Sequence, residues 1–402
     1  MSSLSNAEHA VIDLAQGQPM LDQVLAWSAI NSGTRNLTGL AAMANQLANG
    51  FAALPGDMAF DQPAPVSAVQ PDGTTTMIDH GAHLVLTVRP DAPVQLLLTG
   101  HMDTVFPRDH SFQTTAWRDD VTLNGPGVAD MKGGIAVMLA ALHAVEASPI
   151  AGKLGYQVMI NSDEETGSLS SAPLIERLAR GKLAALTYEP ALPDGTLAGA
   201  RGGTGNFSIT VRGRSAHAGR NPDDGRNALL AAADIALRLA EAHGPGLTVN
   251  PARIDGGGPN NVVPDLAILR VNFRPASIDQ IVRAQAHIDL VVQAAVARHD
   301  VKIDVHGGFN RPPKPIDPGA AKLFALVKAA GADLGLEIGW HATGGVCDGN
   351  NIAACGVPVV DTMGVRGGAI HSADEFLLVD SLAERAALSA LTILRIAERG
   401  HL

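Results

Sequence analysis

A histidine and an aspartate two residues apart, His101 and Asp103, directly follow the apolar run PVQLLLTG, which ends at Gly100. On an extended backbone, side chains two residues apart point to the same side, so Asp103 can orient a metal-binding His101. The alternative interpretation is a loop histidine beside a helix-capping aspartate. This motif alone does not decide between the two.

The next carboxylate, Asp130, stands in the glycine-rich segment GPGVADMKGG, which opens a helix. Glycine permits close approach of the backbone, so Asp130 can either cap the helix or bind a cation. The segment matches neither the dinucleotide-binding fingerprint nor the spacing of a phosphate-binding P-loop. We therefore reject a nucleotide-binding transferase.

Carboxylate and histidine side chains that could bind a metal or transfer a proton also follow three further apolar runs. Glu164 and Glu165 lie in NSDEETG, Glu189 closes LAALTYEP, and His371 comes after PVVDTMG. A solvated acidic loop is the alternative for the first of these segments. However, adjacent glutamates at a strand end point in different directions, so one can bind a metal while the other faces the water that the metal activates.

Taken together, the candidate ligands are two histidines and three carboxylates: His101, Asp130, Glu165, Glu189 and His371. This set is too large for one tetrahedral zinc ion but suits two ions that share a bridging carboxylate. Such ions lie about 3.5 to 4 Å apart and act on both the attacking and the leaving oxygen of a hydrolysis. The residue types therefore predict hydrolysis by metal-bound water.

The elements that must position these residues alternate between helices and short apolar runs. Helices are expected near residues 37–53, 131–145, 171–179 and 320–334 and at the C-terminal end, where Ser381 and Glu384 form a capping-box signature. Apolar runs separated by helices predict an α/β fold with a mostly parallel sheet covered on both faces. Such sheets place their chemistry at the carboxyl ends of the strands.

The pattern changes between residues 202 and 312. Segments 206–212 and 265–274 alternate apolar and polar residues, and helical patterns lie near 227–243 and 278–299. We expect a strand-helix-strand-helix-strand insert with an antiparallel or mixed sheet. The predicted domains are therefore 1–201 with 313–402, interrupted by a smaller domain over 202–312.

Composition narrows the possible partners. The 402 residues carry a formal net charge of −11, which argues against nucleic acid. Two cysteines are too few for a disulfide framework, and the first residues show no signal-peptide pattern, so we expect a cytoplasmic protein. The most apolar helical stretch, 134–145, is too short to cross a membrane, and no membrane association is expected.

The motifs HMDTVFP, GPGVADMKGG, NSDEETGS, TYEP and GRSAHAG, with the late His371, resemble in order and spacing the co-catalytic zinc aminoacylase and carboxypeptidase family. This family includes glutamate carboxypeptidases, acetylornithine deacetylase, succinyl-diaminopimelate desuccinylase and carnosine dipeptidases. The resemblance implies a zinc-exopeptidase-like α/β domain interrupted by a smaller α+β lid. Subunits of the family usually form homodimers through this lid.

The resemblance also implies roles for the candidate residues of the larger domain. His101 and Glu189 would bind one zinc ion, Glu165 and His371 the other, and Asp130 would bridge them, although Glu165 and Glu189 are interchangeable in this assignment. Asp103 would orient His101, and Glu164 would act as the general base. Co²⁺ or Mn²⁺ could replace Zn²⁺.

Further candidates are implied outside the metal-binding motifs. His217 in GRSAHAG would reach the partner subunit's active site and polarise the scissile carbonyl, although alone it is typical of a surface turn. Asn261 and Arg274 match positions that hold the substrate carboxylate, and Gly345 lies in the family's glycine-rich substrate loop. The same loop contains Cys347, which we expect to be a small buried filler rather than a nucleophile. Three other basic residues could bind an acidic end of the substrate, although a solvated surface role is the default for each: Arg311, Lys314 and Arg366.

The predicted function is hydrolysis of an amide or peptide bond next to a free carboxylate, with a small peptide or an N-acyl amino acid as substrate. The residue pattern is most similar to the glutamate carboxypeptidases. The alternative within the same class is an N-acyl-amino-acid deacylase. An inactive binding homologue is disfavoured, because all five ligands, Asp103 and Glu164 are present.

Overall fold

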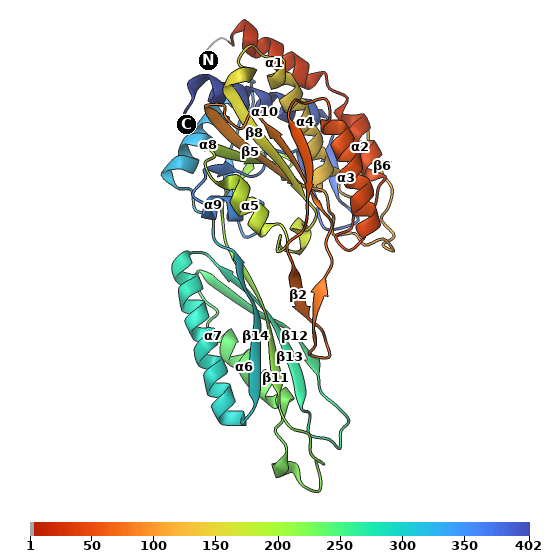
Figure 1. Cartoon of the computed structure of the whole chain (residues 1–402), viewed down its shortest axis with the longest axis vertical. Helices are drawn as coiled ribbons and strands as arrows, with labels where there is room; N and C mark the ends of the chain where they lie inside the picture. The colour runs from red at the N-terminus through yellow and green to blue at the C-terminus, as the bar shows by residue number, and fades with distance from the viewer. Residues whose placement is uncertain (1–3) are drawn as a thin grey trace.

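The computed structural model describes residues 4–402 and shows two bodies, a larger domain and an elongated lid that extends away from it (Figure 1). The larger domain contains about the first half and the last quarter of the chain, and the lid is the segment 204–311 between them. Each body has its own hydrophobic core. Only the strands at the boundary join the two along the chain.

The larger domain is built on a six-stranded sheet in the order β1-β4-β8-β5-β9-β16. Its strands are β1 (Asp57–Asp61), β4 (His83–Val88), β5 (Val94–His101), β8 (Leu154–Asn161), β9 (Ala184–Thr187) and β16 (Val359–Val360). Strands β8, β5, β9 and β16 are parallel to one another, while β4 pairs antiparallel with β8 and β1 with β4. The predicted α/β fold class is confirmed, and the two antiparallel pairings of β4 make the mostly parallel sheet mixed.

Helices cover both faces of this sheet. They are α1 (Asn6–Gln16), α2 (Met20–Ser28), α3 (Leu37–Phe51), α4 (Gly133–Glu146), α5 (Ala172–Ala179), α8 (Pro318–Asp333), α9 (Asp348–Ala354) and α10 (Asp380–Arg399). Along β5, Leu96 and Leu98 join the core beneath α1, α4 and α10, whereas Leu97 joins the core beneath α5 and α9. Because consecutive side chains of a strand face opposite sides, β5 must be apolar throughout.

Helix α4 is the central helix of the larger core. Together with the preceding turn it forms an apolar segment, Val128–Glu146, long enough to cross a membrane and longer than the 134–145 stretch predicted from the sequence. This segment is almost entirely buried against the sheet and its neighbouring helices. Its apolar character is therefore that of a core helix.

Helix α10 begins at Asp380, and its start differs from the predicted capping box. The Ser381 hydroxyl donates to the carbonyl of Leu378 and accepts from the backbone N–H of Arg366, while Glu384 forms an ion pair with Arg366 at 3.3 Å. No side chain caps the helix. The capping-box prediction is wrong because tertiary contacts to the preceding loop take both side chains.

The lid is a four-stranded antiparallel sheet in the order β12-β13-β11-β14, with two helices on one face. Its elements are β11 (Thr204–Arg212), α6 (Ala228–Ala240), β12 (Leu247–Gly256), β13 (Leu266–Pro275), α7 (Ile278–His299) and β14 (Lys302–Arg311). The prediction missed β12. Pro251 interrupts its apolar pattern, and the register with β13 shifts between Pro251 and Arg253.

Within residues 4–402, the larger domain also contains three smaller sheets. They comprise the hairpin β2 (Val66–Val69) with β3 (Thr75–Ile78), the pair β10 (Leu197–Arg201) with β15 (Trp340–Thr343), and a four-stranded sheet of β6 (Ala116–Trp117), β7 (Thr122–Asn124), β17 (Gly367–Gly368) and β18 (Phe376–Leu378). The hairpin β2–β3 reaches from the larger domain to the lid (Figure 1). The pair β10–β15 lines the cavity described next.

Candidate active site

Three parallel strands deliver chemically capable side chains to one edge of the central sheet. His101 is the last residue of β5, Glu164 and Glu165 follow β8 in the turn η3 (Glu164–Thr166), and Glu189 follows β9. Because β8, β5 and β9 are adjacent and parallel, their carboxyl ends meet at the same edge. The sheet therefore brings these residues together although they are far apart in the sequence.

Asp130 and His371 join this group from outside the sheet. Asp130 lies in the distorted turn η1 (Val128–Lys132) before α4, and its two carboxylate oxygens face different histidines. Oδ1 lies 3.0 Å from Nε2 of His101, and Oδ2 lies 3.3 Å from Nε2 of His371. One carboxylate therefore lies between the two histidines.

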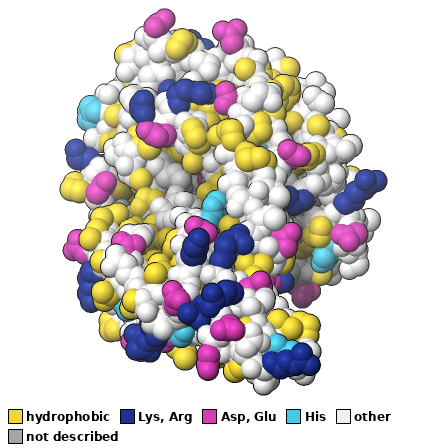
Figure 2. Space-filling model, turned by 60° about the horizontal axis from the view of Figure 1, so that its bottom comes forward, with side chains coloured by type: hydrophobic (Ala, Val, Ile, Leu, Met, Phe, Trp, Pro, Cys, Tyr) yellow, Lys and Arg dark blue, Asp and Glu magenta, His cyan; other side chains and the backbone are white. Residues whose placement is uncertain are grey.

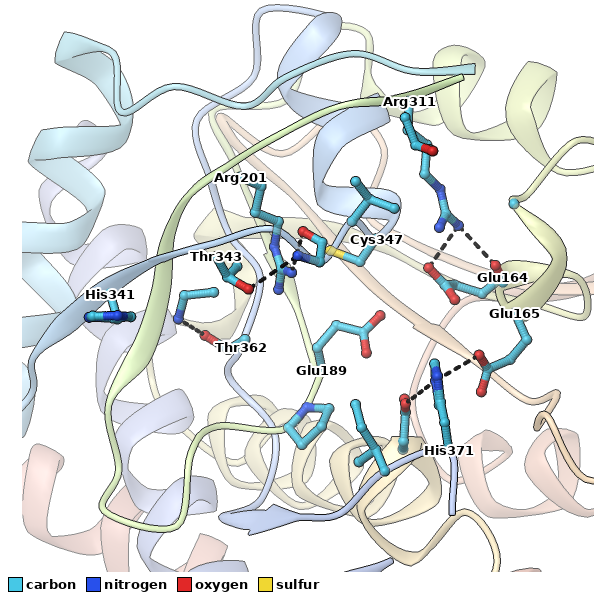
Figure 3. A pocket seen from close by; sticks show the side chains of 18 of the residues that line it. Glu164, Glu165, Glu189, Arg201, Arg311, His341, Thr343, Cys347, Thr362 and His371 are labelled. Carbon is cyan, nitrogen blue, oxygen red and sulfur yellow. Dashed lines mark hydrogen bonds and ion pairs between the residues drawn. The ribbon is translucent and has the colours of Figure 1, made fainter. Parts of the chain in front are cut away.

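The remaining carboxylates divide between the same two histidines. Oε2 of Glu189 is 3.8 Å from Nε2 of His101. Oε2 of Glu165 is 3.1 Å from Nε2 of His371, the pair that Figure 3 shows. Ligand atoms of His101, Asp130 and Glu165 also lie within 4.8 Å of one another. All five predicted ligands are therefore neighbours, while the pairing of Glu165 and Glu189 with particular ions stays a prediction.

The electrostatics of this group fit a divalent cation. Burial and the neighbouring Asp130 raise the pKa of Glu165 to about 8, and burial raises the pKa of Glu189. Oε1 of Glu189 is buried without a hydrogen-bond partner among residues 4–402. A metal ion would stabilise buried carboxylates whose oxygens lack hydrogen-bond partners, and it would also bind the neighbouring imidazole nitrogens.

Asp103 contacts His101 and also supports the neighbouring glutamates. Nδ1 of His101 lies 3.0 Å from the backbone carbonyl of Asp103 and 3.5 Å from its Oδ1. Because a carbonyl only accepts hydrogen bonds, this contact places the proton on Nδ1 and directs Nε2 toward the other candidate ligands. The Asp103 carboxylate also accepts the backbone N–H groups of Glu164 and Glu165, both at 3.2 Å, and so fixes their turn.

Glu164 is buried beside Arg311, the last residue of β14 at the boundary with the lid. Nη2 of Arg311 lies 2.7 Å from Oε1 of Glu164 and donates to the Glu164 backbone carbonyl at 3.0 Å and to Ser168 at 2.7 Å (Figure 3). Burial raises the pKa of Glu164 to about 7, and Arg311 opposes this rise. These contacts hold the carboxylate in a fixed orientation.

The surface role predicted for Arg311 and Lys314 is wrong. Arg311 is 4% exposed, and Nζ of buried Lys314 pairs with Asp361 at 3.1 Å. Arg366 instead pairs with Asp380 and Glu384 and has no contact with the cavity. The sequence carries no local signal for Arg311, whose partner lies 147 residues away.

Sequence reasoning also missed Glu375, four residues after His371. Its buried carboxylate accepts the backbone N–H groups of Gly127 at 3.1 Å and of Ala129 and Asp130, both at 3.0 Å. These bonds tie the loop that carries His371 to the turn that carries Asp130. The sequence signal that could have identified Glu375 is its short distance from His371 in the segment HSADE.

A cavity of about 620 Å³ opens beside the candidate ligands, between the larger domain and the lid. Arg274 and Gly345 line it, as predicted for substrate-binding residues. Nε of Arg274 donates to Asn272 at 2.9 Å, while Nη1 and Nη2 have no hydrogen-bond partner among residues 4–402. The guanidinium therefore keeps two donors for a ligand.

His217 and Asn261 do not line this cavity. Their loops contact each other through a hydrogen bond from the N–H of Ala218 to the carbonyl of Asn261, at 2.9 Å. The loop between β11 and α6, which contains His217, lies at the far end of the lid (Figure 1). Within one chain these residues are remote from the metal ligands, so their predicted roles would require a second subunit.

Cys347 is buried at the start of α9, where its Sγ accepts the N–H of Gly349 at 3.3 Å. Burial raises the pKa of this thiol well above its ordinary value, so the thiolate nucleophile is disfavoured. Behind it, Arg201 pairs with Asp361 at 2.7 Å. These contacts agree with the predicted filler role.

Comparisons with known proteins agree with this geometry. Residues 97–395 match the sequence profile described as "Peptidase family M20/M25/M40". Carboxypeptidase G2 of Pseudomonas sp. strain RS-16 is 30% identical over 323 residues, which cover 78% of this chain and 77% of that protein. Succinyl-diaminopimelate desuccinylase of Verminephrobacter eiseniae is 27% identical over 281 residues, 66% of this chain and 68% of that protein.

A solved structure supports the fold. The YXEP protein of Bacillus subtilis, described as a dinuclear metal binding peptidase from the M20 family, superimposes with a TM-score of 0.63 at 15% identity and covers 94% of this chain and 98% of its own. The family resemblance noted in the sequence is thereby confirmed, and with it a metal-dependent hydrolase that acts on amide bonds. The chain belongs to peptidase family M20/M25/M40.

Proposed function

We propose that the protein hydrolyses an amide or peptide bond next to a free carboxylate, as a carboxypeptidase that releases glutamate or a similar amino acid. The observation that carries the proposal is the position of Arg274. Its two free guanidinium donors line the same cavity as Glu164 and the candidate metal ligands. A planar pair of donors is well matched to a substrate carboxylate.

Two Zn²⁺ ions are the proposed cofactors, with Co²⁺ or Mn²⁺ as possible substitutes. His101 and Glu189 would hold one ion, His371 and Glu165 the other, and Asp130 both, in keeping with the short distances from Asp130 to each histidine. Bound there, the ions would polarise the scissile carbonyl and lower the pKa of a water molecule.

Glu164 is proposed as the general base. It lies beside the ligand group, is shielded from solvent, and has a pKa raised to about 7 by burial. A carboxylate with a pKa near the working pH can take a proton from the attacking water and return it to the leaving nitrogen. Arg311 holds this carboxylate in place during both transfers.

A homodimer formed through the lid is part of the proposal. The lid helices expose large apolar side chains, among them Leu230 (61% exposed) and Leu237 (72%) on α6, with Val282 and Leu290 on α7. Strand β12 is also an unpaired edge of the lid sheet. Exposed apolar clusters and open sheet edges are typical of subunit interfaces, and dimerisation offers His217 and Asn261 a route to a partner's cavity.

The second candidate is an N-acyl-amino-acid deacylase. It is favoured by the similarity to desuccinylases, which stands beside the similarity to a carboxypeptidase. Both reactions need a carboxylate at Arg274 and differ in the group on the other side of the scissile bond. Side chains of the cavity such as Leu192, Leu197 and His341 would contact that group.

Hydrolysis measured on a matched panel separates the candidates. Acyl, aroyl and dipeptide substrates sharing a C-terminal glutamate are compared with acetyl and succinyl derivatives of other amino acids, before and after chelation. Chelator-sensitive release of glutamate from the first group supports the carboxypeptidase, whereas preference for the second group supports the deacylase. A metal-loaded protein that hydrolyses neither group contradicts the proposed function.

A further inference from the structure

A second cavity, of about 300 Å³, adjoins the main one and lies beneath the hairpin β2–β3. We call this second cavity the annex. Both cavities are lined by Thr166, Gly167, Thr204, Asn206 and Arg311. Because they share this wall, a ligand that occupies the main cavity can extend into the annex without leaving the protein.

The hairpin forms a roof over the annex. Ser67, Ala68 and Val69 of β2 line it, and the hairpin rests on the lid through two hydrogen bonds. Nε2 of His306 donates to the carbonyl of Ser67 at 2.9 Å, and Arg212 donates to the carbonyl of Gly73 at 2.6 Å. The annex thus lies between the hairpin and the lid, and it is partly open to solvent.

The floor of the annex is the face of the lid sheet that α6 and α7 leave uncovered. Alternate residues of β11 and β13 point there, with Asn206 opposite Asn272 and Ser208 opposite Arg270. The intervening side chains, such as Ile209, form the lid core. This face therefore offers hydrogen-bonding groups to a ligand, within a wall that also contains apolar side chains such as Leu169 and Phe207.

Basic side chains stand in the wall of the annex, although Arg270 pairs with Asp255 and Arg311 pairs with Glu164. Arg270, His306 and Arg311 line it, and no Asp or Glu is present among the described residues of its wall. Arg270 bonds Ser208 through Nη1 at 2.7 Å and Asp255 through Nε at 3.3 Å, which leaves its Nη2 without a partner within residues 4–402. Basic side chains also gather on the lid end of the surface, mixed with acidic ones, in a chain of net charge −11 (Figure 2).

Arg274 links the two cavities. It lines the main cavity, and its Nε donates to Asn272, which lines the annex. Arg270 lies four residues earlier on β13, so the Cα atoms of the two arginines are about 14 Å apart along the strand at about 3.4 Å per residue. This Cα spacing exceeds the distance between the two carboxylates of one glutamate, which favours a longer ligand for the pair.

From this arrangement we propose that the annex is a subsite for a second, distal anionic group on the released part of the substrate. The substrate class is an amide whose leaving amine carries an extended acidic tail, such as a γ-linked diglutamate. Its first carboxylate binds Arg274 and its distal carboxylate binds Arg270 under the hairpin. The assignment rests on the hydrolase function proposed above.

The test compares one acyl group attached to glutamate with the same group attached to γ-glutamyl-glutamate. We expect the wild-type protein to prefer the longer substrate in kcat/KM, and Arg270→Gln to reduce the long-to-short ratio about tenfold, the effect of one charge-assisted hydrogen bond. Arg253→Gln is the matched control, because Arg253 pairs with the same Asp255 but does not line the annex. An equal ratio in wild type and Arg270→Gln would overturn the proposal.

A second variant guards against a structural effect of Arg270. Ala68→Trp fills the annex from its roof and should also reduce the ratio, whereas Met77→Trp adds the same bulk to an exposed position of the hairpin outside the annex and should not. If the metal-loaded protein hydrolyses neither substrate, the hydrolase proposal fails. Calorimetric binding of γ-diglutamate then tests the annex alone, and equal affinity for wild type and Arg270→Gln would refute it.

Discussion

In the larger domain, four side chains of the candidate site stand at or just after the ends of the parallel strands β5, β8 and β9, whereas the side chains that the lid contributes depend on contacts between domains. His101, Glu164, Glu165 and Glu189 follow apolar runs that must end at one edge of the sheet. Arg274 reaches the cavity only because the lid sheet lies beside the larger domain, and His217 does not reach it within one chain. Topology alone thus fixes the first group, while the second needs tertiary or quaternary structure.

This contrast predicts that one variant can abolish catalysis without unfolding the lid, and that another can destabilise the lid without removing the metal. Glu164→Gln keeps the shape of the side chain but removes the proton acceptor, so kcat should fall by about 10²- to 10⁴-fold. Because Glu164 is not among the proposed ligands, elemental analysis should find the metal content of the variant unchanged. Loss of metal together with activity would instead make Glu164 a ligand.

The converse variant breaks the lid. Phe273 is fully buried in the lid core and packs edge-on against Phe207 and Phe309. Phe273→Ala should destabilise the lid by about 3–5 kcal/mol, seen as an early thermal transition, while metal binding by the larger domain persists. Phe60→Ala, at an exposed position, is the control. If the variant instead unfolds in a single transition and loses its metal at the same time, the lid and the larger domain do not unfold independently.

Arg311 connects the two regions, since it ends a lid strand and holds Glu164. Arg311→Gln should reduce kcat by about 10²-fold through misplacement of the base. Its positive charge lowers the pKa of Glu164, so its removal should shift the acidic limb of the kcat profile to higher pH. Arg311→Lys retains the positive charge, so it should return the acidic limb of the kcat profile close to its wild-type pH, while kcat itself should recover less. An unshifted limb in Arg311→Gln would contradict this role.

Glu375 tests the support of the metal-binding turn. Glu375→Gln replaces one of the two accepting carboxylate oxygens by an NH₂ group, which cannot accept the N–H groups of Gly127, Ala129 and Asp130. The turn that carries Asp130 should then be held less firmly, and metal affinity should fall about 10- to 100-fold. Competition with a chromogenic chelator measures the change. Glu384→Gln, remote from the cavity, should leave affinity at the wild-type value.

The parts that the sequence predicted are those encoded in short segments. Motif spacing placed the five candidate ligands on strand ends and turns, and helical periodicity identified α6 and α7 nearly to their bounds. Strand β12 was missed because Pro251 and a register shift break its alternation. The burial of Arg311 was missed because its partners come from the segment after β8 and from α9, which no local pattern connects.

The central claim is that Asp130 is shared by two metal ions, and a metal titration of the stripped protein tests it most directly. Isothermal titration with Zn²⁺, checked by elemental analysis after gel filtration, should give two equivalents per chain for the wild type. Asp130→Asn should weaken both equivalents, because each Asp130 oxygen faces a different histidine. One equivalent in the wild type, or loss of only one in Asp130→Asn with the other at full affinity, would contradict the account.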